Sequence, residues 1–170
     1  MLSTRLVGYT GRTTTVTDPL GRTRSVVHDV TGRLRRVVDP SPGGTTRYDY
    51  DSTGNLVRLQ DPIGAVSTGQ YNARGFRKRW TDVDAGTWTY VGNSFNEVTA
   101  WTDANGRTSS ASYDTLGRLV SRTEPEGVST WTWGNDAGAH NIGRLKSVVG
   151  LGYGEEYFYD TVGRLATREI

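Results

Sequence analysis

Two histidines, two adjacent glutamates and one short acidic loop are the parts of this sequence whose residue types best suit catalysis or metal binding. His28 and His140 lie far apart in the chain, which does not favour a shared metal site or general base. Glu155 and Glu156 would point to opposite faces of a strand, because consecutive side chains alternate. No motif that activates a serine nucleophile occurs. The sequence therefore predicts no catalytic residue and no metal site.

The acidic loop, Asp103-Ala104-Asn105-Gly106, looks like a fragment of a calcium-binding loop. The residues that follow it, 107–109, supply no glutamate at the distance that calcium coordination requires. Equivalent places in the chain carry sequences such as Asp18-Pro19-Leu20-Gly21, which are typical of turns. A turn is therefore favoured over a calcium site. No glycine-rich phosphate loop is present, and we expect no cofactor.

Composition favours short strands that are connected by tight turns. Hydrophobic residues make up only 34% of the 170 residues, whereas glycine occupies 22 positions. The charges nearly balance, with 20 basic and 18 acidic residues, and the arginines are spread along the whole chain. Such an even distribution argues against a nucleic-acid-binding surface, which needs a basic patch.

The chain contains no cysteine, which excludes disulfide bonds, thiolate catalysis and cysteine-based zinc sites. The first five residues are not followed by an apolar run, so no signal peptide is predicted. No stretch is long and apolar enough to suggest a transmembrane span. These observations leave the cellular compartment open.

Internal repetition organises the chain. A glycine expected in a tight turn recurs about every 21 residues, and asparagine replaces it once, as is common where φ is positive. One interval is longer because residues 135–140 are inserted. We predict that residues 1–170 form a single array of about eight repeats. The turn positions are Gly11, Gly32, Gly54, Gly75, Asn96, Gly117, Gly143 and Gly163.

A second turn divides each repeat into two segments of strand length. It combines an acidic residue with proline or glycine, as in residues 61–64. Aromatic residues alternate with other residues between the turns, which places them on one face of a sheet. Each repeat is therefore predicted to be a β-hairpin, and the fold an all-β, curved antiparallel sheet of tandem hairpins. The aromatic pairs are Tyr48 and Tyr50, Trp88 and Tyr90, Trp131 and Trp133, and Tyr157 and Tyr159.

Equivalent residues of the repeats form columns with expected structural roles. The aspartate three residues before the turn glycine can accept backbone N–H groups of the turn. The arginine after the glycine can pair with that aspartate or stack on an aromatic ring, and the leucines and tyrosines can pack between hairpins. The predicted structural residues are Asp29, Asp51, Asp114 and Asp160; Gly32, Gly54, Gly75, Gly117, Gly143 and Gly163; Arg33, Arg118, Arg144 and Arg164; Leu34, Leu56, Leu119, Leu145 and Leu165; and Tyr48, Tyr50, Tyr71, Tyr113 and Tyr159.

Three aromatic residues are candidate glycan contacts, because flat aromatic faces stack on sugar rings. They are Trp131, Trp133 and Tyr157. Packing between neighbouring strands explains the same residues without a ligand and is favoured. The insertion at residues 135–141 is the least repetitive stretch and should project from a turn, which makes it the best place for a specific contact.

The motif Tyr-Asp-x-x-Gly-Arg-Leu at this period resembles the YD repeat of the Rhs family. Residues 113–119 and 159–165 match all five defined positions. Residues 50–56 match except for Asn55 in place of arginine, and residues 28–34 carry His28 in place of tyrosine. The family includes Rhs polymorphic toxins, wall-associated proteins of Gram-positive bacteria, subunits of insecticidal toxin complexes and the animal teneurins. The resemblance covers essentially the whole chain.

This resemblance implies a β-sheet strip that spirals into a hollow shell around a toxin or other cargo. It also implies a secreted or surface-exposed bacterial protein and a non-enzymatic role for the repeats. The family's core segment, its protease-like Asp motif and a toxin domain are not found in these residues, so we expect a fragment of a larger shell. The implied partners are the rest of that shell and its cargo, and exposed sheet edges favour self-association.

Alternatives to the shell remain open at this point. Surface-exposed hairpin repeats can bind carbohydrate, as choline-binding repeats do, although those repeats are richer in tryptophan and lysine. A β-propeller with two hairpins per blade, or an aromatic hairpin solenoid, would also suit a repeat of this length.

Overall fold

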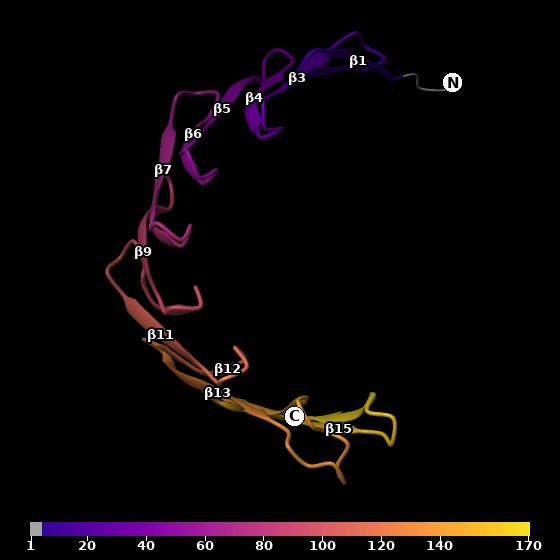
Figure 1. The fold of residues 1–170 in the computed structure, drawn as a ribbon, viewed down its shortest axis with the longest axis vertical. Coiled ribbons are helices and arrows are strands. Elements are labelled where there is room, and N and C mark those ends of the chain that lie inside the picture. Colours follow the sequence, from indigo (N-terminus) through magenta and orange to yellow (C-terminus); the bar gives the residue numbers. More distant parts are fainter. Residues whose placement is uncertain (1–4) are drawn as a thin grey trace. The chain divides into compact units, whose positions relative to one another are not determined.

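The computed structural model describes residues 5–170, which form strands and turns without a helix. Their contacts divide the chain into two compact units, Met1–Thr87 and Trp88–Ile170. Within each unit the strands form a single curved layer (Figure 1). Each unit is therefore a strip of sheet rather than a sandwich of two layers.

The first unit contains β1 to β8, and each of these strands pairs antiparallel with the next one in the sequence. The second unit contains a meander of the same kind from β9, which begins at the boundary between the units, to β16. Consecutive strands are neighbours because only short turns separate them. The strands of the first unit are β1 (Leu6–Thr10), β2 (Thr13–Thr17), β3 (Thr23–His28), β4 (Leu34–Asp39), β5 (Gly44–Tyr50), β6 (Leu56–Gln60), β7 (Val66–Tyr71) and β8 (Arg77–Asp82). Those of the second are β9 (Gly86–Gly92), β10 (Val98–Thr102), β11 (Thr108–Tyr113), β12 (Leu119–Glu124), β13 (Gly127–Trp133), β14 (Leu145–Gly150), β15 (Tyr153–Tyr159) and β16 (Leu165–Glu169).

The turn after β3 shows how most of the hairpins close. The Asp29 N–H donates to the carbonyl of Arg33 over 2.8 Å, and the Gly32 N–H donates to the carbonyl of Asp29 over 3.1 Å. The same pair of backbone hydrogen bonds recurs at Asp18 and Asp103. The motif turns and several of the acidic turns halfway through the repeats therefore have the same geometry, although their sequences differ.

A β-bulge follows the leucine position of each hairpin that closes with the repeat motif, from β3–β4 onward. In β3–β4 the pairing moves from Val27 opposite Arg36 to His28 opposite Leu34, so Arg35 has no direct partner. Equivalent shifts occur in β5–β6, β7–β8, β9–β10, β11–β12, β13–β14 and β15–β16. A bulge bends its strand and increases the local twist. Its repetition at one position bends each of these hairpins in the same way and contributes to the curvature within each unit.

Few side chains are fully buried in the described part of either unit. Among residues 5–170, Val37 and Val148 are the only buried apolar side chains. Burial instead alternates along strands such as β13, where Trp131 and Trp133 are half-buried and Thr132 is exposed. The cohesion of the sheet therefore comes from backbone pairing and from contacts between neighbouring hairpins on one face, because no second layer covers it.

These features confirm the predicted fold class of an all-β antiparallel sheet built from tandem hairpins. The eight strands of each unit are continuous neighbours and are not divided into four-stranded blades, so the β-propeller alternative is wrong. The structure also explains why hydrophobic residues are scarce in this sequence, because a single layer of strands needs few of them.

Candidate functional site

Each motif aspartate holds its turn through both carboxylate oxygens. Asp114 Oδ1 accepts the N–H groups of Leu116 and Arg118 over 2.9 and 3.0 Å, and Oδ2 accepts Arg118 Nε over 2.7 Å. Asp29 and Asp160 make the same set of contacts with the residues of their own turns. The turn thereby fixes the start of the following strand and the direction of the arginine side chain.

The motif of the third repeat keeps this arrangement with a neutral partner. Asn55 replaces the arginine, and its Nδ2 donates to Asp51 Oδ2 over 2.9 Å. The side-chain hydrogen bond from Asn55, together with backbone N–H groups, lowers the pKa of Asp51 to about 2. The pKa of Asp114 is also lowered, mainly by the hydrogen bond from Arg118. Both carboxylates are therefore charged well below neutral pH, and Asp51 makes its turn contacts without an ion pair.

The turn glycine position requires a positive φ. Gly117 has a φ of 75°, and Asn96, which takes the place of glycine in the fifth repeat, has a φ of 64°. The expectation that Asn96 adopts positive φ is confirmed. Asparagine is among the few residues with a side chain that adopt this conformation readily.

The arginine of one repeat reaches the aromatic residue of the next. The guanidinium carbon of Arg118 lies 4.9 Å from the ring centre of Trp133. Arg33 lies 5.1 Å from the ring of Tyr50, and Arg144 lies 5.4 Å from the ring of Tyr159. A guanidinium placed over an aromatic face is attracted by the electrons of the ring. These contacts form a series between repeats, which we call the arginine–aromatic ladder.

The polar atom of the same aromatic residue donates a hydrogen bond to the preceding repeat. Trp133 Nε1 donates to the carbonyl oxygen of Leu119 over 2.9 Å. The hydroxyl of Tyr159 donates to Leu145 O over 2.7 Å, and that of Tyr113 donates to Val98 O over 2.9 Å. The acceptor is in each case the residue at the leucine position. One aromatic side chain therefore binds the neighbouring hairpin with its face and with its polar atom.

The remaining motif residues take simpler positions. Leu34, Leu56, Leu119 and Leu145 are half-buried, whereas Leu165 at the start of β16 is 55% exposed. Arg164 pairs with Asp160 over 2.9 Å, with its side chain 79% exposed. Tyr48 lies directly opposite Leu59 in β5–β6, and Tyr71 lies opposite Arg77 in β7–β8. The structure brings the motif together as repeated small clusters and not as one site.

Each of the three candidate glycan contacts has a partner within the chain. Arg122 lies 5.9 Å from the ring of Trp131, and Arg118 lies over Trp133. The hydroxyl of Tyr157 donates to Glu155, and this hydrogen bond is the main cause of the raised pKa of Tyr157. The two tryptophan rings therefore pack against arginines of the preceding hairpin, and the Tyr157 hydroxyl is bound within its own strand, β15.

The insertion contains a structural residue that sequence reasoning missed. Asn141 is buried, and its Oδ1 accepts the N–H of Asp136 over 3.0 Å while the side chain lies against Gly134. It thereby closes the base of the inserted loop, for which the sequence predicts only a projection from a turn. Asparagine next to a glycine-containing turn was the available signal, because its side chain readily bonds to the backbone.

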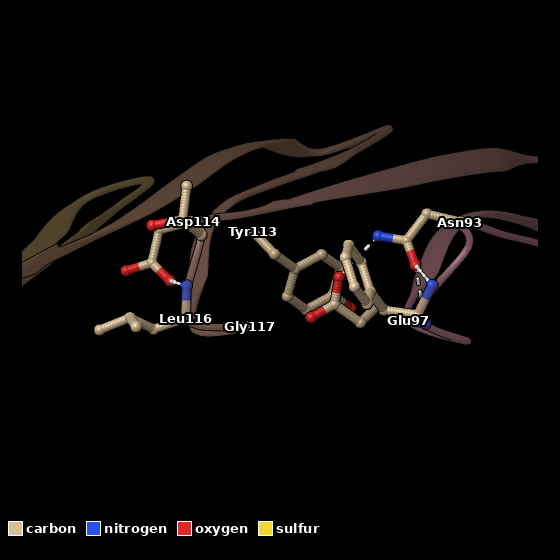
Figure 2. A pocket seen from close by; sticks show the side chains of 8 residues that line it. Asn93, Glu97, Tyr113, Asp114, Leu116 and Gly117 are labelled. Atoms are coloured by element: carbon tan, nitrogen blue, oxygen red, sulfur yellow. Dashed lines mark hydrogen bonds between the residues drawn. The ribbon is translucent and has the colours of Figure 1, made fainter.

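A second missed residue is Glu97, which lies in a pocket between two neighbouring hairpins of the second unit. The pocket has a volume of about 480 Å³ and is lined by Asn93, Phe95, Glu97 and residues 113–117. Figure 2 shows the Tyr113 ring pointing from its strand toward Glu97, with Asp114 directed to the other side. Glu97 occupies the arginine position of its repeat, which is visible in the sequence as a reversal of charge.

Within residues 5–170, no group of three or more histidine, aspartate or glutamate side chains has a metal-binding arrangement. The described part of the chain also contains no helix with the length and apolarity needed to cross a bilayer.

Comparison with known proteins agrees with the repeat geometry. The family model described as the RHS Repeat matches residues 28–66 and 92–138, which together are about half of the chain. No curated protein matches the sequence.

Solved structures with a similar fold come from toxin complexes. The crystal structure of TcdB2-TccC3 matches with a TM-score of 0.77 at 18% identity, and the Tc holotoxin pore of Photorhabdus luminescens matches with a TM-score of 0.75 at 18% identity. In both cases the match covers 96% of this chain and 10% of the other chain, so the chain spans about a tenth of the length of these structures. At this identity the structural likeness concerns the fold alone. Because the family model matches half of the sequence, the chain belongs to the RHS repeat family.

Proposed function

We propose that residues 1–170 are a single array of structural repeats that forms part of the wall of a larger Rhs-type shell, and that this wall encloses a toxin or other cargo. The observation that carries this proposal is the single-layered sheet, whose hairpins are joined by the arginine–aromatic ladder instead of by a core. Such a sheet has two accessible faces, so it can separate an interior from the solvent.

The roles of the motif residues are part of this proposal. The aspartate and glycine columns shape the turns, and the arginine, leucine and aromatic columns hold neighbouring hairpins at a constant spacing. The function is accordingly structural, with no catalytic step assigned to these residues. The partners of the chain are the remaining repeats of its parent protein and the enclosed cargo, and the site of action is outside the producing cell or at its surface. Membership of the RHS repeat family supports this assignment.

The test uses the full-length parent protein. We expect electron cryo-microscopy to place these strands in the wall of a closed cavity that contains polypeptide from another part of the same protein. Limited proteolysis should leave the enclosed segment intact in the wild type. A parent protein in which these strands form an open arm, with no enclosed polypeptide and no protected segment, would overturn the proposal.

Carbohydrate binding is the competing function, and it is tested separately. Trp131 and Trp133 already stack with Arg122 and Arg118, which reduces the aromatic surface that is available to a sugar ring. We expect no glycan to be retained on a glycan array by the wild-type chain. Binding that is lost in the Trp131→Ala, Trp133→Ala double variant would instead favour a glycan-binding module.

A further inference from the structure

The arginine–aromatic ladder is interrupted in the fifth repeat. Asn96-Glu97-Val98 occupies the position of Gly-Arg-Leu in the complete motif, so a carboxylate stands where the complete motifs have a guanidinium. The next repeat still supplies the aromatic residue, Tyr113, whose hydroxyl donates to Val98 O over 2.9 Å. The aromatic member of the ladder contact is therefore present at this position, but the negatively charged Glu97 replaces the positively charged arginine.

Local contacts hold the Glu97 carboxylate at the position of the missing guanidinium. Oε2 accepts Asn93 Nδ2 over 2.6 Å, and the Glu97 N–H donates to Asn93 Oδ1 over 3.1 Å. Oε1 lies against the turn of the next repeat, 2.7 Å from the place that a Cβ on Gly117 would take. Arg118 occupies the equivalent place one repeat later. Its Nη1 lies 3.9 Å from the place that a Cβ on Gly143 would take. Glu97 therefore spans the two hairpins as the arginines do.

The surroundings of Glu97 combine one negative charge with apolar and aromatic walls. Phe95 is 83% exposed and Leu116 is 74% exposed, and both line the pocket together with Tyr113. The pocket is open to solvent, and its volume of about 480 Å³ exceeds that of a single guanidinium group. There is accordingly room for a charged group and for part of the segment that carries it.

The arginine of the following repeat, Arg118, already contacts groups other than Glu97. Arg118 Nη2 pairs with Asp114 Oδ2 over 2.6 Å, and its guanidinium lies over Trp133. The second carboxylate at the pocket, Asp114, is therefore neutralised by Arg118. Glu97 is left as the negative group of the pocket that faces Tyr113 (Figure 2).

We propose that this pocket binds the guanidinium of an arginine side chain from another polypeptide segment. The bound guanidinium would pair with the Glu97 carboxylate and contact the aromatic side chains of Tyr113 and Phe95, which completes the ladder from outside the chain. Arginine suits the site better than lysine because its planar group can pair with a carboxylate and stack on a ring at the same time. The ladder itself provides the precedent, since Arg33, Arg118 and Arg144 occupy the equivalent positions in other repeats. This site is independent of the shell role, because it depends only on contacts within residues 93–118.

The test is a titration of the intact chain with the peptide acetyl-Gly-Arg-Gly-amide, followed by NMR. We expect chemical shifts of residues 93–97 and 113–117 to change together, with a dissociation constant of about 1 mM for such an open site. The isosteric peptide with citrulline in place of arginine lacks the positive charge and should not bind. Equal binding of the two peptides would overturn the proposal, as would tighter binding of tetramethylammonium, which would identify a quaternary ammonium site instead.

Variants separate the pocket from a general effect of charge. Glu97→Gln keeps the shape of the side chain and should weaken binding by about fivefold or more, because it removes one partly exposed ionic contact. Glu126→Gln makes the same change of charge in the turn after β12 and should leave binding unchanged. Glu97→Arg should abolish binding by placing the chain's own guanidinium beside Tyr113. Unchanged binding in Glu97→Gln, or equal losses in Glu97→Gln and Glu126→Gln, would contradict the assignment.

Discussion

The guanidinium of Arg118 stacks on the ring of Trp133, which belongs to the next repeat, while Trp133 Nε1 donates to the carbonyl of Leu119. Two contacts of different chemistry thus join the same pair of hairpins. Ladder contacts of this kind matter more here than in a globular domain, because Val37 and Val148 are the only buried apolar side chains among residues 5–170. The stability of each unit should therefore be sensitive to single contacts on the ladder.

We expect Arg118 and Trp133 to be energetically coupled. A double-mutant cycle with Arg118→Gln and Trp133→Leu should give a coupling free energy of about 0.5–1 kcal/mol, the usual size of a partly exposed cation–π contact. Urea unfolding followed by far-ultraviolet circular dichroism measures it. The control cycle pairs Arg118→Gln with Trp131→Leu, since Trp131 stacks with Arg122. Coupling of the same size in both cycles would contradict a specific contact.

Two strand glycines should respond in opposite directions to replacement by alanine. A Cβ on Gly69 would lie 2.8 Å from Leu56 O and 2.9 Å from the rings of Trp80 and Tyr71, so Gly69→Ala should destabilise the first unit by about 1–3 kcal/mol. A Cβ on Gly154 would meet nothing within 4 Å. Gly154→Ala should therefore be neutral or stabilise the second unit by about 0.5 kcal/mol, because alanine has less freedom when unfolded.

Urea midpoints of the two variants test this pair. Far-ultraviolet circular dichroism follows the unfolding of the strands in both units. If Gly69→Ala proves as stable as the wild type, the close approach of Leu56 and the two rings is not maintained in solution.

Asp51 should make stability depend on pH in the acid range. Its pKa is about 2 in the folded chain and about 3.9 in an unfolded chain, so the folded state binds the proton less readily. The contribution of Asp51 is therefore complete above about pH 4 and is lost as the pH falls toward 2. In the wild type, the urea midpoint should fall between pH 4 and pH 2.

The Asp51→Asn variant removes this titration and keeps an oxygen for the turn. Asn72 is the natural precedent, because its Oδ1 accepts the N–H groups of Arg74 and Phe76 in the equivalent turn. We expect a smaller fall of the urea midpoint between pH 4 and pH 2 in this variant. An identical slope in wild type and variant would show that Asp51 does not contribute to the acid sensitivity.

The chain by itself should self-associate through a sheet edge. All five residues of β1 are exposed, and β1 pairs on one side with β2. An open edge of this kind can pair with another chain, and an added lysine discourages such pairing. We therefore expect Val7→Lys to reduce the concentration-dependent association seen by analytical ultracentrifugation.

Val128→Lys is the matched control. Val7 and Val128 are both 51% exposed, but Val128 lies in β13, which pairs with β12 and β14. This substitution adds the same charge without blocking an edge and should leave association unchanged. Equal effects of the two substitutions would mean that net charge, and not the β1 edge, controls association.

Local features of the sequence were sufficient to predict much of the fold. The period of the turn glycines located eight hairpins, and alternating pairs such as Trp131 and Trp133 identified the half-buried face. Asp114 was expected to bind its own turn, and its hydrogen bonds to Leu116 and Arg118 do so. The bulges, such as the one at Arg35, were not predicted, because no residue type marks them in every repeat.

The sequence by itself determined the strands, the turns and their order, because positive φ, side-chain alternation and turn hydrogen bonds act over only a few residues. Only the tertiary structure decided that Arg118 stacks on Trp133 of the next repeat and that Glu97 spans a pocket toward Tyr113. These relationships depend on the register between neighbouring hairpins. A shift of one residue would turn every side chain of a strand to the opposite face, so the contacts follow from the packing of hairpins against one another and not from the motif alone.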